Sequence, residues 1–198
     1  MSLDQLIPVA FFVIAMVGTP GPNNLMLLTA GANFGFRRSL PHILGITLGC
    51  QVLLLAIALG LGQVFSLWPL SVLLLKLAGG SFLLYMAVQL LRPRVATLGE
   101  AAEARPLSFL QAALFQWVNP KAWLMLITGF ATYANPQQML LSTVLIGLTF
   151  ALVGLPLTCL WNVGGVALKD WLQRGRRLLH FNRVMAALLL ASLLPLLR

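Results

Sequence analysis

Two short polar motifs interrupt long apolar stretches of this sequence and supply the side chains that could bind a ligand. Residues 20–24 (Pro-Gly-Pro-Asn-Asn) lie in the middle of residues 5–36, which contain no charged side chain. Residues 119–121 (Asn-Pro-Lys) lie in a later apolar stretch. Amide and ammonium groups can hydrogen-bond a carboxylate, so these motifs indicate binding rather than catalysis. The candidate substrate-binding residues are Pro20, Gly21, Pro22, Asn23, Asn24, Asn119, Pro120 and Lys121.

The first motif is expected to break a membrane-spanning helix. Pro20 and Pro22 lack a backbone N–H and clash with the preceding turn, so a continuous helix is disfavoured. We expect one half-helix up to Val17 and a second from about Pro22, whose positive dipole end faces the break. Broken backbone in hydrocarbon needs protein or a water-lined cavity to satisfy its polar groups. The alternative interpretation is a structural kink in which both asparagines are satisfied locally.

The composition indicates a membrane protein. The chain of 198 residues is 60% hydrophobic and 9% charged, whereas soluble domains have about 25% charged residues. The net charge of +9 does not indicate a nucleic-acid partner, because the positive residues form short patches between apolar stretches. Cys50 and Cys159 both lie in apolar segments, which argues against a structural disulfide or a metal pair. Asp4 and the lack of a positive N-terminal region lead us to expect no cleaved signal peptide.

The apolar stretches predict an all-α polytopic fold with six transmembrane helices in a single transmembrane domain, residues 1–198. Residues 1–93 would form a first three-helix repeat and residues 107–198 a second. Residues 94–106, the longest polar stretch, would be a cytoplasmic linker. The expected spans cover about 4–34, 41–63, 70–91, 107–133, 139–161 and 178–197.

Lysine and arginine set the expected orientation. They occur in loops one, three and five, the last being the basic stretch 169–183, and are absent from loops two and four. Cytoplasmic loops carry such an excess, so the odd loops are expected in the cytoplasm and both termini outside.

The two halves must then have opposite orientation, and they resemble each other weakly. Pro22 and Pro120 each follow a Gly or Asn and are 98 positions apart. Lys76 precedes Gly79 and Gly80, as Arg183 precedes two alanines in the last span. This pattern is typical of an inverted repeat with a substrate site where two broken helices meet. Coincidence is the alternative, since proline beside asparagine is common.

These motifs resemble those of the LysE/RhtB family of amino-acid exporters, namely residues 20–23, Gly35-Phe36-Arg37-Arg38 and residues 119–122. Lys76 with Gly79-Gly80, and residues 182–186, are similar to the third and sixth spans of that family. The resemblance implies an exporter of amino acids or related zwitterionic metabolites in the bacterial inner membrane, with the proton-motive force as its energy source. Pro41-His42 and the alanines at 186 and 187 depart from the family pattern, which leaves the substrate open.

Three further residues allow more than one role. Lys121 is an intramembrane functional cation if the fourth span begins near Leu107, and an interfacial anchor if it begins at Asn119. Lys76 is a gate or counter-ion, or snorkels to the nearby interface. His42 is a second gate or coupling candidate, or interfacial filler.

The acidic residues Asp4, Glu100, Glu103 and Asp170 all lie outside the apolar cores. We therefore expect no metal site, no cofactor, no carboxylate proton relay and no enzyme activity. The expected partners are an amino acid, protons and membrane lipid, and the small residues of spans two and three fit either a homodimer or packing within one chain. The alternative function is a non-transporting scaffold that holds a partner or anionic lipid through residues 169–183.

Overall fold

The computed structural model describes residues 3–91 and 105–194, and every regular element in those ranges is helical. This confirms the all-α prediction. The predicted linker 94–106 falls almost wholly outside the described residues. The elements are α1 (Leu3–Gly18), α2 (Pro22–Phe34), α3 (Phe36–Ala58), η1 (Leu61–Gln63), α4 (Val64–Leu67), α5 (Leu70–Leu91), α6 (Phe109–Val118), α7 (Pro120–Tyr133), η3 (Pro136–Gln138), α8 (Met139–Leu172) and α9 (Arg177–Ala191).

Several of these helices are suited to a membrane. Among the described residues, α3, α5 and the segment 136–172 are each long and apolar enough to cross a bilayer, and α1 with α2 would make a fourth span. Many large apolar side chains of α5 and α8 are exposed on the outside of the bundle, as expected where lipid rather than water surrounds a protein. Together these features support the prediction of a polytopic membrane protein.

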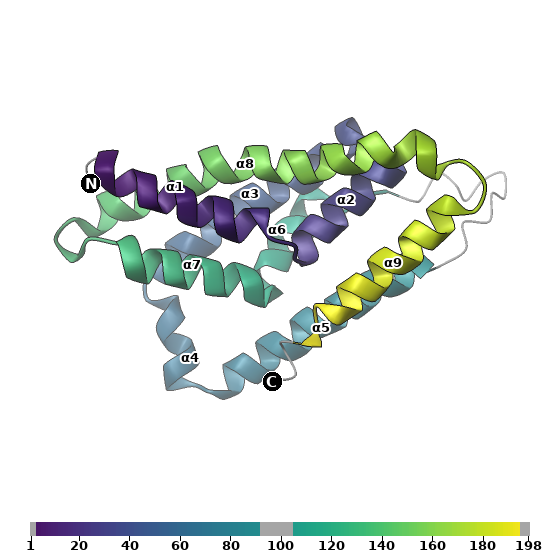
Figure 1. Ribbon diagram of the computed structural model, residues 1–198. Coiled ribbons are helices and arrows are strands. Elements are labelled where there is room, and N and C mark those ends of the chain that lie inside the picture. Colours follow the sequence, from purple (N-terminus) through teal and green to yellow (C-terminus); the bar gives the residue numbers. More distant parts are fainter. Residues whose placement is uncertain (1–2, 92–104, 195–198) are drawn as a thin grey trace.

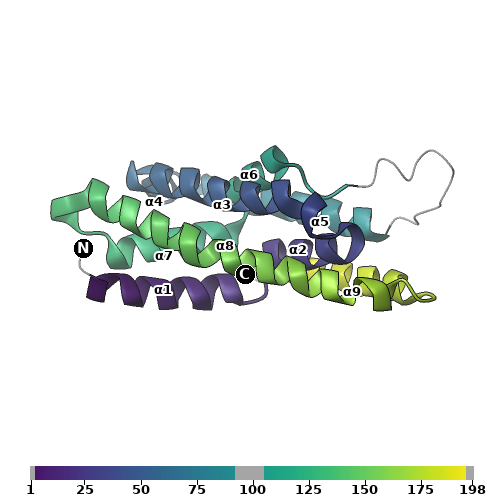
Figure 2. The same ribbon diagram turned by 90° about the horizontal axis from the view of Figure 1, so that it is seen from above.

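The helices form one elongated bundle, in which α5 and α9 make a pair set apart from the other long helices (Figures 1 and 2). Helices α1, α2, α3, α6, α7 and α8 pack against one another, with α2 on α8 and α3 on α6 as prominent contacts. Helices α5 and α9 lie side by side, and the short helix α4 joins α5 to the rest (Figure 1).

Glycines set the closest helix approaches. Cβ atoms added at Gly45 and Gly49 of α3 would meet the backbone of α6, at the Phe109 carbonyl and at Ala113. A Cβ added at Gly31 of α2 would overlap the backbone of α8. The small-residue spacing of α3 thus serves packing within one chain, where small residues let backbones approach.

Several element boundaries differ from those predicted: α3 ends at Ala58 rather than near residue 63, and α9 ends at Ala191 rather than near residue 197. Helix α3 begins at Phe36 rather than near Pro41, because Gly35, with φ +84°, ends α2 and turns the chain within one residue. Helix α8 continues to Leu172 instead of ending near Trp161, and its 34 residues correspond to about 51 Å at 1.5 Å per residue. Gly164 and Gly165 do not end it, because they lie where α2 packs against it. Arg37, Arg38 and Lys169 consequently belong to helix ends rather than to free loops.

The contact between α5 and the α6–α7 junction gives a first testable prediction. A Cβ added at Gly79 would overlap the carbonyl oxygen of Val118, whereas one at Gly80 would lie 3.8 Å from Leu193 Cδ2, an ordinary contact. We expect Gly79→Ala to displace α5 from the junction and to cost about 1–3 kcal/mol of stability. The melting temperature in detergent should fall for Gly79→Ala, and an equal fall for Gly80→Ala would contradict this account.

Candidate functional site

The first helix break lies where the sequence predicts it. Helix α1 ends at Gly18 and α2 begins at Pro22, and the two halves differ in direction by 62°. Pro22 occupies the first turn of α2, where its missing N–H leaves no bond unmade. Gly21 precedes it in a fully extended conformation, with φ −174° and ψ 175°. The chain therefore turns through residues 19–21 and starts a new helix without a continuous ladder of hydrogen bonds.

Asn24 ties the two halves together. Its side-chain nitrogen Nδ2 donates to the carbonyl oxygen of Val17 at 2.7 Å and to that of Thr19 at 2.8 Å. Asn24 is 4% exposed, so these bonds give the carbonyl groups at the end of α1 a buried side-chain partner in place of the next helical turn. The second asparagine of the motif thus supports the backbone of the break.

The second break separates α6 from α7 at a single residue. Asn119 caps α7, because its Oδ1 accepts a hydrogen bond from the backbone N–H of Lys121 at 3.2 Å, and Pro120 follows in the first turn. Across the break, Trp123 Nε1 donates to the carbonyl oxygen of Trp117 at 2.8 Å. Asparagine is among the best capping residues and proline fits the first helical position, so this sequence starts a helix at 120.

Lys121 joins the second break to the first. Its Nζ donates to the carbonyl oxygen of Thr19 at 2.8 Å, to Thr19 Oγ1 at 3.0 Å and to the carbonyl oxygen of Pro20 at 3.3 Å. Its side chain passes over Gly21, where an added Cβ would lie 2.8 Å from Lys121 Cδ. Lys121 stands halfway along the α6–α7 unit rather than at its end.

A pair of amides makes a second connection. Asn23 Nδ2 donates to Gln116 Oε1 at 2.8 Å, and Gln116 Nε2 donates back to Asn23 Oδ1 at 3.2 Å. Gln116 has no exposed surface, and its Nε2 also donates to the carbonyl oxygen of Ala112. The two breaks are therefore joined by an ammonium contact and by a reciprocal amide pair.

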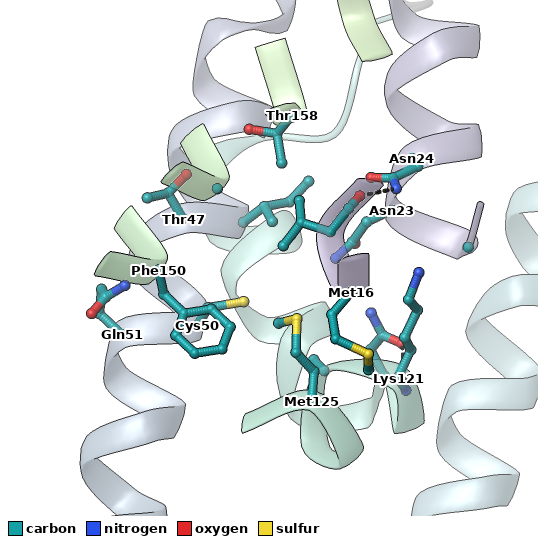
Figure 3. Close-up of a pocket in the computed structure, with 16 residues that line it drawn as sticks. Met16, Asn23, Asn24, Thr47, Cys50, Gln51, Lys121, Met125, Phe150 and Thr158 are labelled. Atoms are coloured by element: carbon teal, nitrogen blue, oxygen red, sulfur yellow. Dashed lines mark hydrogen bonds between the residues drawn. The ribbon is translucent and has the colours of Figure 1, made fainter. Parts of the chain in front are cut away.

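A cavity of about 60 Å³ opens beside these contacts, large enough to hold water. Figure 3 shows Met16 and Lys121 on one side of it and Thr47, Cys50 and Gln51 on the other. Among the described residues that line it, Lys121 is the one with a charged side chain. The lining residues are Met16, Val17, Gly21, Asn23, Asn24, Ile46, Thr47, Cys50, Gln51, Asn119, Lys121, Ala122, Met125, Phe150, Gly154 and Thr158.

Five of the eight candidate binding residues line this cavity: Gly21, Asn23, Asn24, Asn119 and Lys121. The three prolines, Pro20, Pro22 and Pro120, shape the breaks without lining it. Lys76 lies half-buried on α5, and neither it nor His42 lines the cavity. His42 is 1% exposed on α3, and neither of its ring nitrogens has a hydrogen-bond partner among the described residues.

Sequence reasoning missed Gln116 and the contributions of α3 and α8. Gln116 is an uncharged polar residue three positions before Asn119 in an apolar segment, and that position was a usable signal. Thr47, Gln51 and Thr158 gave no comparable signal, because polar residues that face the interior cannot be told from others without the packing.

Comparison with known proteins places the chain in a family. Residues 14–195 match the family described as LysE type translocator. The chain is 32% identical to a cysteine/O-acetylserine efflux protein of Escherichia coli O139:H28, over 87% of each chain. It is also 32% identical to proteins of that name from Escherichia coli K12 and Shigella flexneri, over 86% of each chain. No solved structure matches the chain.

These findings confirm the resemblance noted in the sequence and the prediction of a transporter rather than an enzyme. They support export of amino acids, and neither the family nor the relatives support the scaffold alternative. With its two broken helices joined beside a cavity that Lys121 and three asparagines help to line, the chain belongs to the family of LysE-type translocators.

Proposed function

We propose that this translocator exports small zwitterionic amino acids, of the chemical type of cysteine or O-acetylserine, and that it binds them at the junction of the two helix breaks. The observation that carries the proposal is the contact between the breaks, made by Lys121 with Thr19 and by Asn23 with Gln116. Residues about 100 positions apart thereby line one cavity, in which amide and ammonium groups lie among mostly apolar side chains.

The site has groups for the carboxylate of such a substrate. The start of α2 presents backbone N–H groups and the positive end of a helix dipole, with no side-chain cap on them. Asn23 and Lys121 add side-chain donors on the same side of the cavity. Thr47 and Gln51 of α3 and Thr158 of α8 supply polar groups opposite, suited to a small polar side chain.

The helix contacts support an architecture of six spans in two inverted repeats. In this scheme α1–α2, α3 and α5 correspond to α6–α7, α8 and α9. Three sets of contacts match in this way: α1 with α8 and α6 with α3, α2 with α8 and α7 with α3, and α2 with α9 and α7 with α5. The contacts of α5 with α6 and of α1 with α7 have no counterpart of comparable extent. The remaining large contacts, α3 with α8 and α5 with α9, pair each element with its own counterpart. This is the pattern a two-fold relation between halves would produce.

Charge supports the proposed orientation in the bacterial inner membrane. Gly35, before Arg37 and Arg38, lies beside the end of α8, since a Cβ there would be 3.9 Å from Lys169 Nζ. The α2–α3 and α8–α9 turns thus gather basic residues at one end of the molecule (Figure 1). That end would face the cytoplasm and its anionic lipid, with both chain termini outside, and the proton-motive force would drive export.

Counterflow in proteoliposomes tests the proposal. Vesicles that contain the purified protein and unlabelled L-cysteine should accumulate labelled L-cysteine, and an imposed pH gradient should change the net flux. A panel of basic, acidic and large apolar amino acids defines the selectivity, and protein-free vesicles give the background. A panel in which no amino acid exceeds that background would refute the proposed substrate class.

A further inference from the structure

The contacts of Lys121 Nζ are those of an ammonium subsite. An ammonium group has three N–H donors, and Nζ has three acceptors within 3.3 Å, two carbonyl oxygens and one hydroxyl. All three belong to Thr19 and Pro20, directly after the end of α1, where the helix dipole is negative. The number of acceptors, their chemistry and the local dipole thus suit any primary ammonium group.

None of the three acceptors is a carboxylate. A lysine held by a carboxylate forms an ion pair whose separation leaves an unpaired negative charge, which costs Coulomb energy. Here the oxygens are neutral, so another ammonium group can replace Nζ with no change in net charge at the carbonyls. The contact is therefore suited to exchange.

We infer that Lys121 is a tethered stand-in for the ammonium group of the substrate, and that the two exchange on the oxygens of Thr19 and Pro20. This inference rests on the proposed function. When a substrate ammonium takes these oxygens, Lys121 is released toward the cavity that its side chain also lines, where the substrate carboxylate lies. One ammonium group, of Lys121 or of the substrate, thus always occupies the oxygens at the end of α1. The Lys121 ammonium, once released, pairs with the substrate carboxylate.

Gly21 makes this movement sterically simple. The side chain of Lys121 crosses the link at this glycine, and an added Cβ would lie 2.8 Å from its Cδ and 3.0 Å from its Nζ. The glycine thus leaves a path for Nζ between the carbonyl oxygens and the cavity. The plain alternative is that Lys121 is a permanent cap on α1 that no ligand replaces.

Chemical complementation distinguishes an exchangeable Lys121 from a permanent cap on α1, and it does not require that the substrate be known. Lys121→Ala removes three carbons and the ammonium nitrogen, which together equal n-propylammonium. We expect n-propylammonium to raise the melting temperature of purified Lys121→Ala saturably, with an affinity about tenfold or more above that for the wild type, as charged hydrogen bonds warrant. Propyltrimethylammonium has the charge without N–H donors and should have no such effect. Lys76→Ala, which alters a lysine outside the cavity, is the matched control.

Equal responses of Lys121→Ala, Lys76→Ala and the wild type would overturn the inference, as would equal responses to the two cations. If Lys121→Ala cannot be purified, Lys121→Met keeps a stem of similar length and lacks the ammonium. For that variant the probes are ammonium and tetramethylammonium. Equal responses of the variant and the wild type, or equal responses to the two cations, would again overturn the inference.

Inhibition of L-cysteine counterflow then connects the subsite to the substrate. Cysteamine keeps the ammonium without the carboxylate. We expect cysteamine to inhibit the wild type weakly, because it must displace the tethered Lys121 and brings no carboxylate for the released ammonium, and to inhibit counterflow by Lys121→Ala at about tenfold lower concentration. Equal inhibition of the two proteins by cysteamine would contradict the exchange. If the wild type transports an amino acid but n-propylammonium does not complement Lys121→Ala, the inference alone is overturned. If n-propylammonium complements Lys121→Ala but no amino acid is transported, the proposed function is overturned.

Discussion

Gly165→Ala is expected to prevent the native packing of α2 against α8 and to lower stability by about 3 kcal/mol or more. A Cβ at this position would overlap the carbonyl oxygen of Leu28 and lie 2.8 Å from the backbone nitrogen of Ala32. Both neighbours are backbone atoms of a helix, which cannot move aside as a flexible side chain can. On the facing helix, a Cβ at Gly31 would in turn overlap the carbonyl oxygen of Asn162. The substitution must therefore separate the two helices.

The neighbouring glycine supplies a matched control. A Cβ at Gly164 would lie 3.5 Å from Leu28 Cδ1, an ordinary van der Waals distance, so Gly164→Ala has the same loss of backbone freedom without the overlap. In detergent, the melting temperature of Gly165→Ala should fall by about 6 °C or more relative to the wild type. Two variants with the same melting temperature would show that α2 and α8 do not pack this closely.

The packing of α2 against α8 matters for the candidate site because α2 carries part of that site. Asn162 Nδ2 donates to the carbonyl oxygen of Leu27 at 2.9 Å and holds the middle of α2 on α8. The first turn of α2, with Asn23 and Asn24, is positioned by the same interface. Loss of export should accompany loss of stability in Gly165→Ala, and neither should occur in Gly164→Ala.

The second large effect is expected at the amide pair of Asn23 and Gln116. Asn23→Leu leaves the Gln116 amide with its Asn23 partner gone in a fully buried position, which costs about 1–3 kcal/mol of stability. It also removes a polar group from the cavity. Export of L-cysteine should fall by about 100-fold, which corresponds to about 2.7 kcal/mol. Quantified membrane insertion shows whether the protein remains in the bilayer.

The double variant Asn23→Leu with Gln116→Leu distinguishes a binding role from a structural one. Replacing both partners of a hydrogen bond by apolar groups can be nearly neutral for stability, so the melting temperature should largely recover. If the pair serves the substrate, export stays lost, because two leucines cannot hydrogen-bond a zwitterion. If both stability and export recover, the pair is merely structural. Gln89→Leu, an exposed glutamine on α5, controls for the substitution itself.

The sequence alone sufficed to predict the helix breaks, several helix bounds and the family, because these depend on local chemistry. The breaks near residues 20 and 120 were predictable because a glycine or an asparagine stands directly before proline there, and so was the start of α2 at Pro22. Pro8, Pro41 and Pro156, which lack such a neighbour, lie inside helices. The bounds of α5, 70–91, follow from the apolar run between Pro69 and Arg92. The two proline motifs and their separation also sufficed to indicate the family.

Tertiary structure decided which groups meet. The sequence shows Lys121 as a costly cation but not that its partners are the oxygens of Thr19 and Pro20, about 100 residues earlier. It does not show that Gln116 pairs with Asn23, or that Gly165 lets α2 pack closely against α8. Helix breaks and caps depend on neighbours within one turn, which the sequence lists in order. Contacts between helices depend on rotation and register, which only the packed bundle fixes.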